Sequence, residues 1–187
     1  QIFLSSDYVF DGEKGNYSED DVPNPVNYYG LSKLKAEQLI LKNPINTVIR
    51  TSVIYDWDYR ARFFNSVIKN LQNNQEINAT TDVYNSVTFL DNLVESIFKV
   101  ITLNQNGIFH VVDSACVNRF EFAEMIAKIF RLDKNLIKTV SVQDEPKNIA
   151  KRPKNACLNN SKAKKELGLN FNTIEEGVSR VFMKSQL

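Results

Sequence analysis

The sequence lacks any apolar run that approaches the roughly 20 residues needed to span a membrane as a helix. It also lacks an excess of charge, because 23 Lys and Arg residues against 22 Asp and Glu leave a net charge of +1. A strong basic surface for nucleic acid and an acidic or basic tail are therefore excluded. No signal-peptide pattern is present. With 187 residues, 43% of them hydrophobic, the chain is long enough for one compact domain or two small ones.

Cysteine and histidine are scarce, with only Cys116, Cys157 and His110. The two cysteines lack the spacing of metal ligands, so no metal site is predicted. We expect both to be free thiols rather than a disulfide, which suits a reducing cytosol, and we predict a cytoplasmic location.

What the sequence does contain is an alternation of strand and helix patterns. Predicted strands cover residues 1–6, 47–55 and 107–113, and predicted helices cover 61–73, 118–130 and 175–183, with two further helices beginning near Asn27 and Asp91. Such alternation predicts an α/β fold with a parallel sheet. Residues 7–27, rich in Gly, Pro and acids, are predicted to be a long loop, and residues 145–168 a basic, loop-rich segment.

The stretch "YYGLSK" at residues 28–33 places Tyr29 and Lys33 one helical turn apart. An ammonium beside a phenol favours the phenolate, and a tyrosine in that setting can act as a general acid or base. The same spacing also fits a half-buried tyrosine beside a solvated lysine. Ser5 and Ser6 end the first predicted strand, where the ligand crevice of a parallel sheet lies, although serines there can also cap a turn.

Several blocks together resemble one known family. "SSDYVFDG" (5–12), "EDDVPNPVNYYGLSKLKAE" (19–37), "IRTSVIY" (49–55) and "RPKNACLNNSKAKKELG" (152–168) are similar to the extended short-chain dehydrogenase/reductase superfamily, and within it to the dTDP-4-dehydrorhamnose reductase family. The resemblance covers nearly the whole chain.

The resemblance implies catalytic and cofactor-binding roles for matching positions. Ser6 would orient the substrate ketone, and Tyr29 would donate the proton to its oxygen. Lys33 would favour ionisation of Tyr29 and bind the nicotinamide ribose, to which Tyr29 also contributes. Thr51 and Ser52 would line the nicotinamide pocket of NADPH or NADH.

The resemblance also implies contacts to a nucleotide-sugar substrate. Asp7 and Tyr8 would face the sugar, and Arg152 lies in the motif of the substrate lobe, where a surface role in packing the loop is equally compatible with the pattern. His110 occupies a strand position that the family fills structurally, so no catalytic role is assigned to it. The chain departs from the family at Val53, where a tryptophan is usual, and at residues 83–89, which replace a Gln-x-Gly-x-Pro-Thr stretch.

The predicted activity is NAD(P)H-dependent reduction of the C4 ketone of dTDP-4-dehydro-L-rhamnose. The alternative is a non-catalytic regulatory subunit, because the β subunit of methionine adenosyltransferase shares the same blocks. An epimerase or dehydratase of the superfamily is a third possibility, against which the block at residues 5–12 argues. A homodimer is the oligomeric state considered, with neither nucleic acid nor a membrane as a partner.

The implied architecture is a partial Rossmann-type parallel sheet with a smaller mixed α/β substrate lobe. Residues 1–54 and 82–113 are assigned to the dinucleotide-binding domain with the catalytic helix, and residues 55–81 and 114–187 to the substrate-binding lobe. The family's Gly-rich phosphate loop does not occur in this sequence. We therefore expect the N-terminal strands of the sheet to be missing, and this chain alone to be inactive.

Overall fold

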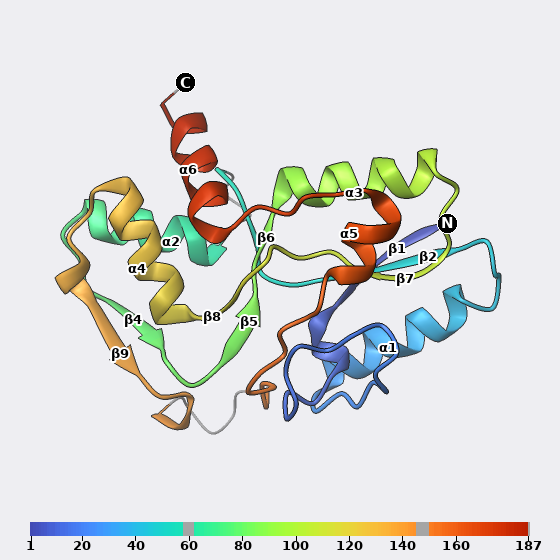
Figure 1. Ribbon diagram of the computed structural model, residues 1–187. Coiled ribbons are helices and arrows are strands. Elements are labelled where there is room, and N and C mark those ends of the chain that lie inside the picture. Colours follow the sequence, from blue (N-terminus) through green and yellow to red (C-terminus); the bar gives the residue numbers. More distant parts are fainter. Residues whose placement is uncertain (58–61, 145–149, 187) are drawn as a thin grey trace.

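The computed structural model describes residues 1–57, 62–144 and 150–186 (Figure 1). Its central element is a three-stranded sheet in the order β1 (Ile2–Ser6), β2 (Thr47–Thr51) and β7 (Gly107–His110). Both pairings are parallel. The predicted parallel pairing of the first two strands is confirmed, although the second predicted strand is broken into β2 and the short β3 (Ile54–Tyr55).

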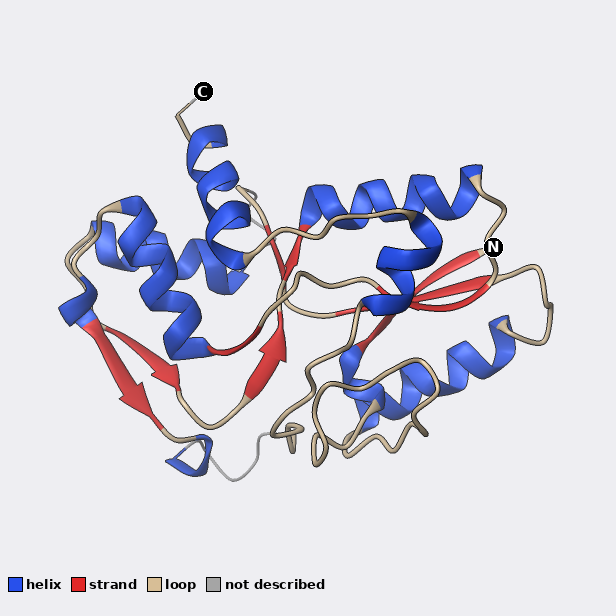
Figure 2. Cartoon of the chain, viewed as in Figure 1, coloured by secondary structure: helices blue, strands red, loops and turns tan. Residues whose placement is uncertain are grey.

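Helices cover both faces of this sheet (Figure 2). Helix α1 (Tyr28–Ile40) lies on one face, and α3 (Leu90–Thr102) and α5 (Ser161–Leu167) lie on the other. Alternate residues of a strand point to opposite faces. Ile49 and Phe109 accordingly join the apolar cluster under α3 and α5, while Arg50 points toward α1. The short α5 falls within the segment predicted to be loop-rich, and its seven residues were not predicted to be helical.

Helix α1 is held to the sheet by charge more than by apolar packing. Its only buried residues are Gly30 and Glu37, and Leu39 is 64% exposed. The Glu37 carboxylate accepts hydrogen bonds from Nε and Nη2 of Arg50, the latter at 2.7 Å. Both side chains are almost fully buried, at 1% and 2% exposure. This pair fixes α1, the helix that carries Tyr29 and Lys33, to the middle strand.

His110 completes this buried cluster. Its Nδ1 donates to the carbonyl of Tyr17 at 3.0 Å, which leaves Nε2 to accept from Nη1 of Arg50 at 3.3 Å. Burial and the neighbouring Arg50 charge lower the pKa of His110 to about 3. The ring is therefore a neutral structural link between a loop and the sheet.

We expect His110→Leu to destabilise the protein at pH 7 by about 1 to 3 kcal/mol, because Arg50 and Tyr17 each lose a partner. The lowered pKa means that the unfolded chain takes up the proton first as pH falls from 6.5. The stability contributed by neutral His110 is thus present above pH 6.5 and is lost toward pH 3. In urea titrations at several pH values, the stability advantage of the wild type over the variant should fall by up to about 1.4 kcal/mol per pH unit and change sign before pH 3. A wild-type advantage that increases in acid would contradict this assignment.

A second group of helices packs away from the sheet, with α2 (Arg62–Gln72), α4 (Arg119–Phe130) and α6 (Ile174–Lys184) around one core. Beside them, β4 (Ile77–Thr80) and β9 (Ile137–Val140) pair in parallel. The remaining pairs are β3 with β6 (Thr88–Phe89), parallel, and β5 (Tyr84–Ser86) with β8 (Cys116–Asn118), antiparallel. Short 3₁₀ turns cover Asp7–Val9, Lys134–Leu136 and Val142–Asp144.

The predicted helices are confirmed, and the proposed division of the chain into two domains remains a prediction. Among the described residues, no helix is long and apolar enough to cross a membrane.

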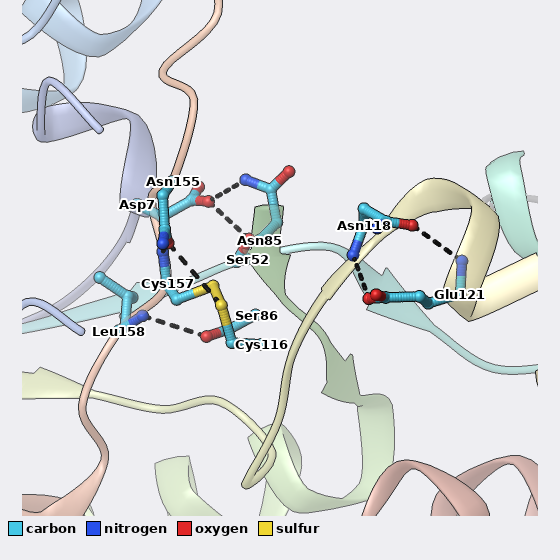
Figure 3. Close-up of a disulfide and its surroundings, with 10 residues drawn as sticks. All are labelled: Asp7, Ser52, Asn85, Ser86, Cys116, Asn118, Glu121, Asn155, Cys157 and Leu158. Carbon is cyan, nitrogen blue, oxygen red and sulfur yellow. Dashed lines mark hydrogen bonds between the residues drawn. A yellow bond between two sulfur atoms is a disulfide. The ribbon is translucent and has the colours of Figure 1, made fainter. Parts of the chain in front are cut away.

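The two cysteines form a disulfide, which corrects the prediction of free thiols. Cys116 in β8 and Cys157 lie 41 residues apart in sequence but 5.5 Å apart between Cα atoms (Figure 3). Their spacing in sequence gave no sign of this, because the two segments are brought together by tertiary contacts, among them those of β5. Tyr84 of that strand pairs with Asn118 on β8 and with Asn155. The prediction of a cytosolic location was argued in part from free thiols, and that argument no longer applies.

Removal of this disulfide should destabilise the fold measurably. Opening a closed loop of 41 residues gives back chain entropy to the unfolded state worth up to about 4 kcal/mol. We expect Cys116→Ser with Cys157→Ser to lower the melting temperature in calorimetry, and a reducing agent to lower that of the wild type to a similar extent. A wild-type melting temperature that does not respond to the reductant would show that the bond is not formed in solution.

Candidate functional site

A pocket of about 490 Å³ opens at the carboxyl ends of β1 and β2. This is where parallel α/β sheets place their ligand crevices. The residues that line it are Leu4, Ser5, Ser6, Asp7, Tyr8, Tyr29, Lys33, Thr51, Ser52, Val53, Ile54, Asn85 and Arg119. Seven of the eight predicted site residues are therefore brought together in one pocket, and only Arg152 is not among its lining residues.

Asp7 is the centre of a buried hydrogen-bond network in the pocket (Figure 3). Its Oδ1 accepts from the hydroxyl of Ser6 at 2.9 Å. Its Oδ2 accepts from the hydroxyl of Ser52 at 2.6 Å and from Nδ2 of Asn85 at 2.9 Å. Burial raises the pKa of Asp7, and the hydrogen bonds from Ser52, Ser6 and Asn85 act in the opposite direction. At 2% exposure, Asp7 orients its neighbours rather than offering an open contact to a ligand.

This network limits what Ser6 can do. A serine hydroxyl has a single proton, and that of Ser6 is directed at Asp7, while its Oγ accepts from the backbone N–H of Tyr8 at 3.2 Å. Ser6 can donate to a ligand oxygen only if the hydroxyl turns away from Asp7 or Asp7 holds a proton itself. In this arrangement the Ser6 hydroxyl points to Asp7 and is not directed into the pocket.

Tyr29 and Lys33 form the opposite wall, on the first two turns of α1. Asn27 caps this helix by accepting from the N–H of Gly30 at 2.8 Å. Lys33 Nζ donates to the carbonyl of Leu4 at 3.0 Å and lies 5.8 Å from the centre of the Tyr29 ring. Tyr29 is 52% exposed and meets the Tyr8 ring edge to face at 5.8 Å. The phenol and the ammonium thus share the pocket, as the four-residue spacing predicted.

Thr51 and Ser52 close the pocket at the end of β2. Thr51 donates to the hydroxyl of Thr88 at 3.0 Å, and Thr88 in turn donates to the carbonyl of Ser52. Both predicted positions are buried, which gives this part of the wall a fixed shape. Hydroxyl groups, an ammonium and a phenol around one cavity can together hold a polar ligand and move a proton to or from it.

Arg152 lies near the pocket without lining it. The backbone carbonyl of Lys151 accepts from Nδ2 of Asn27 at 2.9 Å, which places this segment against the start of α1. Burial and the Asp7 charge raise the pKa of Tyr8, and the charges of Arg152 and Arg119 oppose that shift. Arg152 is therefore near enough for its charge to affect Tyr8, and its predicted role in binding substrate remains a prediction.

Asn85 and Arg119 line the pocket but were not predicted as site residues. Asn85 falls within residues 83–89, one of the two places where the sequence departs from the resembling family, and Val53, the other, also lines the pocket. The departure at residues 83–89 could have pointed to Asn85. Nothing in the sequence pointed to Arg119, because it begins a helix 67 positions after Ser52 and that spacing does not indicate that the two line the same pocket. Among the described residues, no group of acidic, histidine or cysteine side chains could hold a metal ion.

Comparison with known proteins gives a match over the whole chain. The model of the family described as "RmlD substrate binding domain" matches residues 1–187. A curated relative, the "Probable low-salt glycan biosynthesis reductase Agl14" of Haloferax volcanii, is 31% identical over 95% of this chain and 61% of its own length. "Methionine adenosyltransferase 2 subunit beta" of Bos taurus is 31% identical over 86% of this chain and 50% of its own length.

The solved structures agree with these relatives. The dTDP-4-dehydrorhamnose reductase from Bacillus anthracis, in complex with NADP, superposes with a TM-score of 0.89 at 30% identity. The superposition covers 98% of this chain and 65% of that one. The chain therefore spans less than two thirds of the length of each of these proteins.

Proposed function

Because this chain belongs to the RmlD substrate-binding domain family, we propose that the whole protein is a nucleotide-sugar reductase. Its substrate would be dTDP-4-dehydro-L-rhamnose, reduced at the C4 ketone to dTDP-L-rhamnose. The observation that carries the proposal is the meeting of Ser6, Tyr29 and Lys33 in one pocket at the carboxyl end of a parallel sheet.

In this proposal Tyr29 is the proton donor. Its ring stands at the pocket, half exposed, on the first turn of a helix whose start is fixed by the Asn27 cap. Lys33 places a positive charge beside it, which stabilises negative charge on the phenol oxygen after the proton has left. Ser6 holds the ketone oxygen once its hydroxyl turns from Asp7, and Asp7 keeps Ser6 and Ser52 in place.

A reduced nicotinamide cofactor supplies the hydride to C4 when it is bound. The pocket fits its ribose and nicotinamide chemically, because Lys33, Thr51 and Ser52 offer an ammonium and hydroxyls for its polar groups. The NADP complex of the Bacillus anthracis relative supports NADPH over NADH. Asp7, Tyr8 and Arg152 are proposed to form the sugar side of the site, with Asp7 acting through the residues that it orients.

The test is an assay of NADPH oxidation by the whole protein, with a dTDP-4-keto sugar as substrate. We expect oxidation that depends on the sugar, with a product reduced at C4. Binding of nucleotide without oxidation of NADPH by any 4-keto sugar would contradict the proposal.

The second candidate is a regulatory subunit, favoured by the relative from Bos taurus. A pull-down with methionine adenosyltransferase, run beside the activity assay, separates the two. Capture of that enzyme by a protein without reductase activity would support the regulatory role.

A cytoplasmic location and a homodimer complete the proposal. The location now rests on the resemblance alone, since the disulfide between Cys116 and Cys157 is more common in oxidising compartments. Neither nucleic acid nor a membrane is proposed as a partner.

A further inference from the structure

Arg119 is a partly buried cation on the wall of the pocket that holds Tyr29 and Lys33. It is the first residue of α4, and its guanidinium lies over the ring of Phe63 from α2, 4.3 Å from the ring centre. Its Nη1 is buried without a hydrogen-bond partner among the described residues. The guanidinium therefore rests on an aromatic face, while its Nη1 has no hydrogen-bond partner among the described residues.

The described part of the chain supplies no ion-pair partner for Arg119. Among residues 1–57, 62–144 and 150–186, no carboxylate forms an ion pair with it. Asp7 is near enough to influence it, but that carboxylate already accepts hydrogen bonds from Ser6, Ser52 and Asn85. A buried charge is costly unless a partner compensates it, so an anionic ligand in the pocket would relieve this cost.

The N-terminus of α4 is not the group that we consider for binding an anion. Asn118 accepts from the N–H of Glu121 at 2.8 Å, and the Glu121 carboxylate accepts from the N–H of Asn118 at 3.0 Å (Figure 3). This capping box takes up the N–H groups of Asn118 and Glu121, two of the donors at the start of the helix. The guanidinium of Arg119 is thus the group available to a ligand.

We propose that Arg119 binds the diphosphate of the nucleotide-sugar substrate, an inference that rests on the proposed function. A guanidinium presents a planar pair of donors that matches phosphate oxygens, whereas a neutral sugar ring would leave its charge uncompensated. Arg119 and Phe63 come from α4 and α2, which lie apart from α1, the helix that carries Lys33 (Figure 1). The diphosphate of the substrate, rather than that of the cofactor, is therefore assigned to Arg119.

The test measures binding to the whole protein by calorimetry, with dTDP, thymidine and NADPH as probes. Arg119→Gln should weaken dTDP binding by about 10- to 100-fold, the value of a hydrogen-bonded contact to a charged group. Binding of thymidine, which has no phosphate, and of NADPH should not change. Arg180→Gln, an exposed arginine of α6 outside the pocket, is the control with the same change of charge and should leave dTDP binding unchanged.

Melting curves without ligand control for unfolding of the variant. The melting temperature should not fall, because the substitution removes a cation that has no ion-pair partner among the described residues. If Arg119→Gln does not fold, Arg119→Lys keeps the charge but not the paired donors, and should still weaken dTDP binding.

Unchanged dTDP binding in Arg119→Gln would overturn the proposal. So would an equal loss for thymidine, or a loss confined to NADPH, which would assign the residue to the cofactor. Arg119-dependent dTDP binding in a protein that reduces no 4-keto sugar would leave this inference standing while the proposed reductase activity fails.

Discussion

Tyr29→Phe is expected to lower the turnover of the whole protein by about 10²- to 10⁴-fold, the usual range for loss of a general acid. The ring and its contact with Tyr8 remain, and the hydroxyl makes no hydrogen bond to another described residue, so the melting temperature should not change. The measurement is the steady-state rate of NADPH oxidation with saturating dTDP-4-keto sugar. Tyr28→Phe is the matched control, because this neighbouring tyrosine is 84% exposed and does not line the pocket.

Two further substitutions make this prediction sharper. Lys33→Met should lower turnover and also weaken binding of NADPH, since the ammonium is proposed to serve both. Ser6→Ala should cost less than Tyr29→Phe, about 1 to 3 kcal/mol in transition-state stabilisation, because it removes one hydrogen bond to the ketone oxygen. Equal activity of Tyr29→Phe and the wild type would remove Tyr29 from the mechanism.

Glu37→Leu is expected to destabilise the protein by about 3 to 5 kcal/mol, because it leaves the Arg50 charge buried without its partner. Urea denaturation of the whole protein measures this loss. The exposed pair between Lys128 and Glu175 provides the comparison, and Glu175→Gln should cost less than about 1 kcal/mol. A small loss for Glu37→Leu would mean that water reaches Arg50.

Replacing both members of the buried pair separates charge from packing. Glu37→Leu combined with Arg50→Met removes both charges, and such apolar replacements are often neutral or stabilising. We expect the double variant to recover part of the stability lost in Glu37→Leu, with some cost remaining because His110 loses its contact with Arg50. A double variant less stable than Glu37→Leu would contradict this account.

The parallel sheet and most helices could be predicted because their signals are local. The helix at Arg119–Phe130 has its apolar spacing and its Asn118 cap within a few residues of each other. The seven-residue α5 could not be predicted in the same way, since only Ala163 and Leu167 of it are buried and tertiary contact with the sheet decides its structure.

The predicted part of the site consists of residues that lie at the ends of strands or at the start of a helix. Ser6 and Thr51 end neighbouring parallel strands, and Tyr29 begins the helix between them, so topology alone brings them together. The orienting role of Asp7 and the presence of Arg119 depend on side-chain contacts between segments far apart in sequence. The disulfide escaped prediction for the same reason, since β5 brings its two cysteines together.

Gly30, between Tyr29 and Lys33, limits which substitutions a redesign of this protein can introduce in α1. A Cβ atom at position 30 would lie 2.0 Å from the carbonyl oxygen of Tyr8, so the helix rests directly on the backbone of the turn after β1. The neighbouring atom belongs to the main chain and cannot swing aside as a flexible side chain would. Saturation mutagenesis of α1 should therefore tolerate many residues at the exposed Leu39 and recover only glycine at position 30. A library intended to alter substrate preference should therefore vary the side chains that line the pocket, because the distance between this helix and the turn after β1 is fixed by the close approach of their main chains.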